Sequence, residues 1–424
     1  MIIFFIRRYN DIDHLVPVID KIASENNSQI LVYSINPDLN IDDFRLTYLL
    51  KSYGIKTQYV HHNPYESQMS FLLRLTIFNP KIFKISKYLN YTFLNIILSY
   101  VHKFFRRLYG SKNFDEAIKR YFDIDWCKHF LRKNNAKVVA FDWVKKDQHI
   151  AGNMMHAAKD LEIKIFALPH GLNVMTSNLI TWREFEQGYP SDKSEDFNLF
   201  DHFVVNNINE KNYYSLRGVP DRKINVLGSP RFSKQWREKY KNILIEKTLL
   251  PKKEKALKVV YFEHSNIYRG YEEETRKTIE QLIHHDFIDL IIKPHTRSNT
   301  SENPDFIKYV SSKQSFNLIK WCDVAIGVTS SIFIDVILEK KAFILPKYLT
   351  DNSSLYQEYN VCWEVSSYEE LESALQKISL NPNELPYGHN EIDLFMKSTV
   401  YNFSEDVLSA YRDLLSGRGN FDKL

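Results

Sequence analysis

Three hydroxyl side chains follow a short apolar run in the second half of the chain. The run Val324-Ala-Ile-Gly327 leads into Thr329, Ser330 and Ser331, and a helical period then continues to about residue 339. The first turn of a helix has backbone N–H groups without partners and the positive end of the helix dipole, and nearby hydroxyls add donors. This pattern predicts a site for a diphosphate. It is also typical of a helix that simply begins with a serine N-cap.

Cationic side chains follow a second apolar run. In Ile291-Ile-Lys-Pro-His-Thr-Arg297 the run ends at Lys293, and His295 and Arg297 follow on the same short loop. Three potentially cationic groups at this spacing could neutralise a leaving diphosphate without a metal ion. The alternative is a solvated basic loop that binds no ligand.

A histidine follows an apolar run in the first half of the chain, in Ala167-Leu-Pro-His-Gly171. Because imidazole titrates near neutral pH, His170 facing a cleft could act as the general base on an acceptor hydroxyl. A single histidine at such a position is also compatible with a structural role. Asp142 and His264, which likewise follow apolar runs, are the next candidates for the catalytic base.

Two further segments carry side chains that could contact a nucleotide. Val226-Leu-Gly-Ser-Pro-Arg231 ends where the chain would pass to a second domain, and a guanidinium at Arg231 could clamp phosphate oxygens there. An interdomain salt bridge is the alternative for Arg231. Glu358, in Tyr356-Gln-Glu-Tyr359, could contact the ribose of a donor.

Parallel β-sheets are expected to position these side chains, because short apolar runs alternate with helical periods along both halves. Helices are predicted near residues 13–25, 42–53 and 150–161. Strands are predicted at residues 2–6, 29–34, 57–61, 137–141, 163–168, 202–205, 224–227, 259–262, 289–292, 324–326 and 342–345. Open parallel sheets bind their ligands at the carboxyl ends of strands, where most of the candidate residues lie.

The chain of 424 residues is too long for one ordinary core, so two α/β domains are expected. We expect an N-terminal, acceptor-side Rossmann-like domain over residues 1–231 and a basic helical crossing over 232–258. Residues 259–424 are then expected to form a C-terminal domain that binds a nucleotide donor. The cleft between the two domains would hold the reaction.

The composition is that of an ordinary folded protein, with 44% hydrophobic and 25% charged residues. The net charge of +4 is too small to indicate a nucleic-acid binder. Three cysteines without a C-x-x-C pair are expected to be reduced thiols, which indicates the cytoplasm. The short apolar start before Arg7 and Arg8 predicts a strand and no signal peptide, and no apolar run is long enough to span a membrane.

Residues 67–112 interrupt the strand pattern with a basic helical stretch. This window has eight Lys or Arg residues and no Asp or Glu, with many Phe, Leu and Ile residues between the charges. Basic helices with an aromatic-rich apolar face bind anionic membrane surfaces. The insert therefore predicts peripheral contact with the inner face of the plasma membrane. The alternative is a helical cap that packs on its own domain.

The order of these motifs is similar to that in the CDP-glycerol glycerophosphotransferases of teichoic-acid assembly and in related capsule and lipopolysaccharide glycosyltransferases. The resemblance covers residues 164–346, and its matching segments are His170-Gly171, Gly228-Ser-Pro-Arg231, Lys293-Pro-His295, and Ser330-Ser331 with Asp335. It implies a GT-B fold, a nucleotide-activated donor held by the second domain, and a lipid-linked or oligosaccharide acceptor. It also implies His170 as the base, His295 as the group that stabilises the leaving phosphate, and the two serines as ligands of phosphate oxygens.

Positions beside the matching residues depart from the family's usual form. Pro169 stands where the family usually has tryptophan, Thr296 where it has proline, and Val328-Thr329 where it has Asp-Tyr. These differences leave the donor open between CDP-glycerol and a sugar carried by CMP, CDP, UDP or GDP.

The sequence therefore predicts a metal-independent transferase of surface-polymer synthesis that works without a bound cofactor. One alternative is a non-hydrolysing UDP-sugar 2-epimerase, which would share the architecture. Such epimerases usually carry Gly-Thr-Arg after the first strand, where this chain has Arg7-Arg-Tyr-Asn10. The other alternative is a catalytically silent binding module of a polysaccharide assembly complex, which would not depend on His170 or His295.

Overall fold

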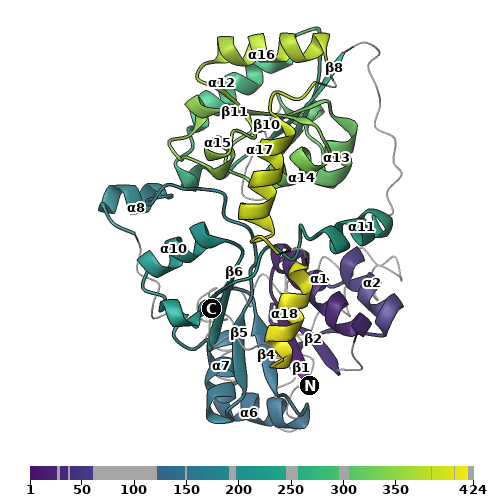
Figure 1. Cartoon of the computed structure of the whole chain (residues 1–424), viewed down its shortest axis with the longest axis vertical. Helices are drawn as coiled ribbons and strands as arrows, with labels where there is room; N and C mark the ends of the chain where they lie inside the picture. Colours follow the sequence, from purple (N-terminus) through teal and green to yellow (C-terminus); the bar gives the residue numbers. More distant parts are fainter. Residues whose placement is uncertain are drawn as a thin grey trace, which may run out of the picture.

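The chain forms two α/β halves that lie one above the other along the longest axis of the molecule (Figure 1). The computed structural model describes residues 1–25, 29–36, 39–60, 122–148, 150–190, 197–244, 256–295, 305–382, 384–404 and 406–418. The predicted basic insert at 67–112 and the candidate residue Arg297 lie outside these ranges. Within them, no helix is long and apolar enough to cross a membrane.

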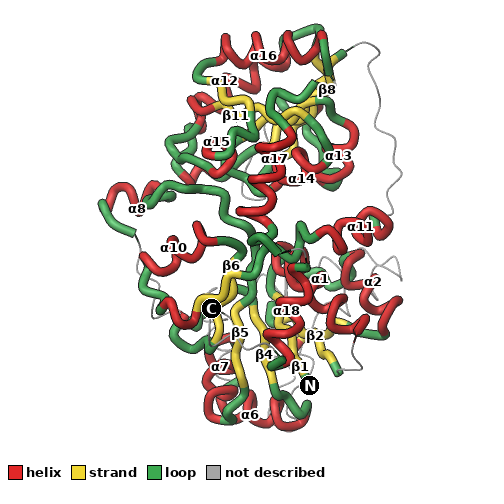
Figure 2. The backbone as a smooth tube through the Cα atoms, viewed as in Figure 1, coloured by secondary structure: helices red, strands yellow, loops and turns green. Residues whose placement is uncertain are grey.

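Seven parallel strands form the sheet of the first half, in the order β3-β2-β1-β4-β5-β6-β7 (Figure 2). The strands are β1 (Ile2–Ile6), β2 (Ile30–Ser34), β3 (Thr57–Tyr59), β4 (Val138–Phe141), β5 (Lys164–Ala167), β6 (His202–Val205) and β7 (Ile224–Val226). All five side chains of the central strand β1 are buried. Because successive side chains of a strand point to opposite faces, Phe5 enters one core and Phe4 enters the other.

Helices cover both faces of this sheet, as expected for a parallel sheet whose central strands are wholly apolar. One face is covered by α6 (Ile124–Lys133), α7 (Ala151–Asp160) and α10 (Ile208–Leu216). The other face is covered by α1 (Tyr9–Glu25), α2 (Phe44–Tyr53), α11 (Lys234–Ile243) and α18 (Val407–Ser416).

Five parallel strands form the sheet of the second half, in the order β12-β11-β10-β8-β9. The strands are β8 (Leu257–Phe262), β9 (Ile288–Lys293), β10 (Val324–Gly327), β11 (Ala342–Pro346) and β12 (Trp363–Val365). Helices α12 (Glu272–Ile283) and α16 (Tyr368–Leu380) pack on one face. The other face carries α13 (Ser315–Trp321), α14 (Ile332–Leu338), α15 (Leu355–Glu358), α17 (His389–Phe395) and the π-helical turn η7 (Met396–Val400).

The predicted strands are all present, with ends that shift by at most two residues. The sequence did not predict β12, a three-residue edge strand with a single buried side chain, because so short an element leaves no apolar run. The α/β class with two Rossmann-like sheets is therefore confirmed.

The end of the chain belongs to the first half, although residues 259–424 were expected to form the second domain. Helix α18 runs down beside α1 (Figure 1) and buries Leu408, Tyr411 and Leu415 in the core under β1. Helix α11, expected within the crossing, also packs on the first half through Trp236. Both helices are amphipathic, and their apolar faces pack on the sheet of the first half. This packing determines which residues belong to the first domain.

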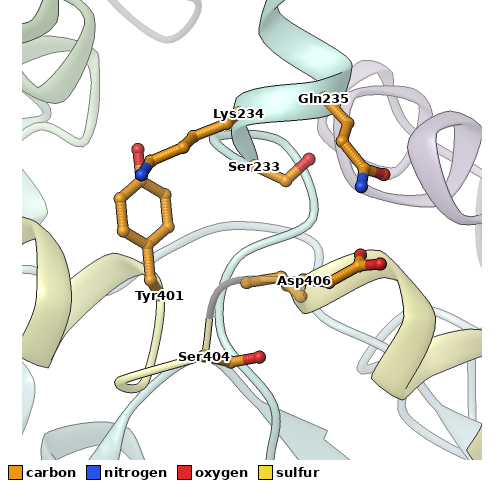
Figure 3. A pocket seen from close by; sticks show the side chains of 7 residues that line it. Ser233, Lys234, Gln235, Tyr401, Ser404 and Asp406 are labelled. Atoms are coloured by element: carbon orange, nitrogen blue, oxygen red, sulfur yellow. The ribbon is translucent and has the colours of Figure 1, made fainter.

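The segment that leaves the first half after β7 and the segment that returns to α18 meet beside a small crevice (Figure 3). We call them the outgoing and the returning segment. It lies between the start of α11, with Ser233, Lys234 and Gln235, and the approach to α18, with Ser404 and Asp406. Its volume of about 10 Å³ leaves room for about one water molecule. The contact between the segments is therefore close.

A third connection between the halves follows β5. After Gly171 the chain crosses to the second half, where Val174 enters its core and Met175 pairs with Ser354. The backbone N–H of Leu355 donates to the carbonyl of Val174 at 2.8 Å. The segment then forms α8 (Trp182–Gln187) and returns to β6. We call residues 171–181 the strap.

The strand order of each sheet reverses next to its first strand. In the first half, β2 and β4 flank β1, and in the second half β9 and β10 flank β8. The loops after flanking strands diverge at such a point and leave a crevice where ligands bind. Both crevices open toward the space between the halves.

Candidate active site

A cleft of about 690 Å³ lies between the two halves, within the usual size range of small-molecule sites. Its walls are the carboxyl ends of β1, β5, β8, β9 and β10 and the helix starts beside them. Side chains that line the cleft include Asp13, His14, Asp43, Arg45, His170, Gly171, Arg231, Glu263, Lys293, His295, Ser330, Ser331 and Asp335.

His170 lies in the wall of the first half, above a buried ion pair. Its Nδ1 is 3.4 Å from Oδ2 of Asp142, close enough for an ion pair but without the geometry of a hydrogen bond. Asp142 is 1% exposed and accepts from Nε of Arg7 at 3.0 Å, while a terminal nitrogen of Arg7 contacts its other oxygen. Burial alone would raise the pKa of Asp142, but His170 and Arg7 outweigh burial and lower that pKa.

Asp11 is a second buried carboxylate beside this pair. It accepts from the backbone N–H groups of Arg7 and Arg8 at 2.8 and 2.9 Å. Burial and the charge of Asp142 raise the pKa of Asp11 well above its ordinary value. Asp11, Asp142 and His170 each place one potential ligand atom within 4.8 Å of the others, as a metal site would. Because Arg7 already contacts both oxygens of Asp142, these residues fit an orienting ion pair better than a metal site.

The start of α1 and the crossing form a charged part of the same wall. Arg231 pairs with Asp335 of α14 at 2.9 Å and lies 3.8 Å from Asp13 of α1, so it links the two halves. Asp13 also pairs with Arg45 of α2. The side chain of His14 is almost fully buried between these groups. Burial and the charge of Arg231 lower the pKa of His14 to about 3, so the ring is neutral.

The end of β9 supplies the cationic part of the opposite wall. Nζ of Lys293 donates to the carbonyl of Lys313 at 2.8 Å, and burial lowers the pKa of Lys293. The backbone N–H of His295 donates to Glu263 at 3.3 Å, which joins the loop after β9 to the loop after β8. The cleft therefore has a histidine in each wall, His170 from the first half and His295 from the second.

A tight turn between β10 and α14 places the two serines. A Cβ at Gly327 would come within 2.6 Å of the carbonyl oxygen of Phe262, so only glycine fits this approach. Thr329 is left-handed, with φ of 47°, which is rare for a β-branched residue and typical of functional loops. The hydroxyl of Tyr356 holds the turn by donating to the carbonyl of Ser330 at 2.8 Å.

The structure brings six of the predicted site residues to this cleft: His170, Arg231, Lys293, His295, Ser330 and Ser331. Asp142 lies beneath His170, and Thr329 lies in the turn before the serines without lining the described cleft. The guanidinium of Arg231 serves the interdomain ion pair that the sequence allowed as its alternative role.

His264 and Glu358 lie away from the described cleft lining. His264 is buried, and burial together with the charge of His295 lowers its pKa to about 4. Neither ring nitrogen of His264 has a hydrogen-bond partner among the described residues. Glu358 is exposed at the end of α15.

Sequence reasoning missed the site residues that follow β1, of which Asp13 and His14 line the cleft and Arg7 and Asp11 lie beneath His170. Arg7, Asp11, Asp13 and His14 lie on the turn into α1 and on its first turns, and they match no motif. One signal could have found them, since β1 is the first and most apolar strand of a parallel sheet. The residues after such a strand lie where the strand order reverses.

Comparison with known proteins identifies the fold. No protein-family model matches the chain, and no curated protein matches it. A solved UDP-N-acetylglucosamine 2-epimerase aligns with a TM-score of 0.53 at 8% identity, covering 98% of this chain and 96% of its own. The UDP-GlcNAc 2-epimerase from Neisseria meningitidis, solved with UDP-GlcNAc bound, gives 0.51 at 10% identity and covers 98% of both chains. A variant of the wall teichoic acid polymerase TagF gives 0.50 at 10% identity, covering 98% of this chain and 88% of its own.

These neighbours are enzymes of the GT-B fold, and the chain shares that fold. At 8–10% identity the likeness extends to the fold alone. The neighbours include both epimerases and a polymerase, so the reaction has to be argued from the cleft itself.

Proposed function

We propose that the protein is a transferase that moves a sugar or a glycerol-phosphate unit from a nucleotide-activated donor to an acceptor hydroxyl. The observation that carries this proposal is His170, which lines the interdomain cleft and contacts the buried carboxylate of Asp142 at 3.4 Å. A hydroxyl nucleophile needs such a base, because it must lose a proton as it attacks.

Asp142 would orient His170 and stabilise its protonated form. With Nδ1 directed at the buried carboxylate, Nε2 is the ring nitrogen available to an acceptor hydroxyl. Arg7 keeps Asp142 ionised, which is the state that this task requires.

Lys293 and His295 would stabilise the leaving nucleotide. They lie in the wall of the second half, where the leaving phosphate gains negative charge, and the hydroxyls of Ser330 and Ser331 add hydrogen-bond donors. A bound phosphate favours the protonated forms of both basic groups. A solved enzyme of this fold that holds UDP-GlcNAc supports a nucleotide-sugar donor, and the proposed donor nucleotide is CMP, CDP, UDP or GDP.

The proposed acceptor is a lipid-linked or oligosaccharide chain of a surface polymer, and the proposed location is the cytoplasmic face of the plasma membrane. The likeness of fold to TagF supports the polymer class. Flotation of the protein with anionic lipid vesicles, at low and high salt, tests the membrane contact proposed for residues 67–112. Binding that ignores both lipid charge and salt would contradict it.

A UDP-sugar 2-epimerase is the second candidate, because two of the structural neighbours are such enzymes. An epimerase changes the sugar of the nucleotide sugar itself and needs no acceptor. The two candidates therefore differ in their products.

The deciding experiment combines the purified protein with nucleotide sugars of the four types and with CDP-glycerol, with and without lipid-linked oligosaccharide acceptors. We expect acceptor-dependent release of nucleotide and a gain in acceptor mass, both unchanged by EDTA. Formation of an epimeric UDP-sugar without acceptor would establish the second candidate instead. An unaltered donor under every condition would favour a silent binding module.

A further inference from the structure

His14 is a buried polar side chain of the cleft wall that the proposed chemistry leaves unused. It lies on α1, is 2% exposed, and belongs to the cleft lining. Its Nδ1 is buried and has no hydrogen-bond partner among the described residues. A buried polar group without a partner costs about 1–3 kcal/mol, so such a group at a cleft wall calls for a ligand.

Burial, together with the groups around His14, disfavours a charged imidazole. Arg231 from the crossing, Arg45 from α2 and His170 from the strap side all act against its protonation, and only Asp13 favours it. Together with burial they lower the pKa of His14 to about 3. A neutral imidazole offers one N–H donor and one acceptor nitrogen.

A neutral imidazole matches a hydroxyl better than it matches a phosphate. Phosphates are recognised by cationic donors, and the cations beside His14 are already paired with carboxylates. Arg45 pairs with Asp13 and Asp43, and Arg231 pairs with Asp335. This part of the wall is therefore close to neutral and suits a group that both donates and accepts hydrogen bonds.

We propose that His14 binds a hydroxyl of the acceptor, adjacent to the hydroxyl that His170 deprotonates. This inference rests on the proposed function and adds the acceptor's chemistry to it. Two histidines that reach neighbouring hydroxyls require an acceptor unit with at least two such groups, a polyol or a saccharide. An acceptor with a single hydroxyl would lack the partner of His14.

Two substitutions test this role in the full-length protein. His14→Leu removes both hydrogen-bonding atoms, whereas His14→Gln keeps a donor and an acceptor. We expect His14→Leu to raise the KM for the acceptor about tenfold, the equivalent of one lost hydrogen bond, with the KM for the donor unchanged. His14→Gln should restore part of the loss. His156→Leu, a change of an exposed histidine on α7, is the matched control and should alter neither constant.

Donor affinity separates this inference from a general disruption of the cleft. We expect His14→Leu to bind the donor nucleotide, measured by calorimetry, within about twofold of wild type. An acceptor KM within twofold of wild type in that variant would overturn the inference while leaving the proposed function intact. If His14→Leu does not fold, His14→Ala, which also removes both hydrogen-bonding atoms, takes its place in the comparison.

A binding measurement keeps the inference testable if no donor reacts. The 15N resonances of the His14 ring, assigned by their loss in His14→Gln, can be followed during titration with methyl glucoside and with 1-propanol. We expect methyl glucoside to shift them and 1-propanol to leave them in place. No shift with methyl glucoside would overturn the hydroxyl site, whatever reaction the protein catalyses.

Discussion

At the scale of single residues, Asp142 is the group proposed to orient His170, the proposed base in the first half. The carboxylate is buried, and Arg7 contacts both of its oxygens, so it cannot turn away from His170. Asp11 is a second buried carboxylate beside Asp142, and burial together with the charge of Asp142 raises the pKa of Asp11 well above its ordinary value.

We predict that His170→Ala lowers turnover about 10²–10⁴-fold, the usual contribution of a general base. Asp142→Asn should cause a loss of similar order, because the amide would no longer stabilise a protonated imidazole. Nucleotide affinity, measured by calorimetry, should stay within about twofold of wild type in both variants, because the donor is proposed to bind to the other wall. Normal turnover in His170→Ala would show that the base lies elsewhere, whereas His156→Ala serves as the inert control.

The sequence could predict His170, Lys293, His295 and the serines because each follows an apolar run that is visible in one dimension. It could not predict that His14 lines the cleft, since a polar residue in an amphipathic helix usually faces solvent. Only the central place of β1 in the sheet turns that face of α1 toward the cleft. The ion pair of Arg7 with Asp142 spans 135 positions and has no local signal at all.

The two neutral buried histidines predict a loss of stability in acid. The pKa is about 3 for His14 and about 4 for His264 in the folded protein, against about 6.5 in an unfolded chain. The unfolded state therefore takes up protons below pH 6.5 that the folded state does not. Stability is present above that pH and falls as the pH drops, by about 2 kcal/mol for each histidine between pH 7 and pH 5.

Urea unfolding at pH 7 and pH 5 measures this contribution. His14→Gln and His264→Gln should each reduce the difference between the two pH values by about 2 kcal/mol. His156→Gln should leave the difference as in wild type, because that side chain is exposed. Equal differences in wild type and in both buried variants would mean that these rings are not held neutral.

At the scale of elements, the strap that follows His170 is held by one buried carboxylate. Glu210 of α10 accepts from the backbone N–H of Asn173 at 2.6 Å and from that of Asn206 at 2.7 Å. The amide of Asn206 donates to the carbonyl of Gly171 at 2.8 Å and also to Glu210. Burial raises the pKa of Glu210 to about 7, despite these bonds. The hydrogen bonds of Glu210 and Asn206 therefore hold the loop that carries His170 in place.

Asn206→Ala removes the bond to Gly171 and should therefore displace His170. We predict a fall in kcat of about tenfold or more, since small misplacements of a reacting group are costly, with nucleotide affinity unchanged. Asn209→Ala, three residues further along the chain in the first turn of α10, is the matched control. Its amide also bonds the strap, at the carbonyl of Met175, 3.1 Å away and five residues beyond His170. Equal effects of the two substitutions on kcat would indicate that Asn206 only anchors the strap.

The sequence predicted strand β5 but not the course of the strap that follows it. The strands were predictable because buried parallel strands are continuous apolar runs. The strap has no such run, and its course depends on pairing with Ser354, which lies 179 positions beyond Met175. Likewise, the sequence shows that α18 has an apolar face but not which sheet that face packs on. Helices α16 and α17 have similar apolar faces, and these pack on the second half.

At the scale of the whole molecule, the described residues link the halves through the strap, through the stretch from Gly228 to α11, and through the return to α18. Gly228 has φ of 89°, and a Cβ there would come within 2.9 Å of Val407 on the returning segment. The N–H of Ser229 donates to the carbonyl of Val400 at 2.7 Å. The outgoing and returning segments therefore bind each other three residues before Arg231, which pairs with Asp335 across the halves.

In this arrangement helix α18, from the last part of the chain, packs into the first half of the molecule. Tyr411 of α18 is fully buried beside the first sheet, and its hydroxyl donates to the carbonyl of Gly228 at 2.7 Å. We predict that Tyr411→Ala lowers the free energy of unfolding of the first half by about 3–5 kcal/mol, as for other buried aromatic side chains. Tyr411→Phe keeps the ring and should cost only about 1 kcal/mol for the lost hydrogen bond. Urea unfolding followed by circular dichroism measures both changes, and Leu380→Ala, at a side chain that is 81% exposed on α16, should stay within about 0.5 kcal/mol of wild type.

Since Gly228 leads directly to Arg231, the loss of Tyr411 should also weaken the link between the halves and lower nucleotide-dependent stabilisation. If Tyr411→Ala were as stable as Leu380→Ala, α18 would contribute little to the first half, and residues 259–424 would behave as the independent domain that the sequence alone indicated.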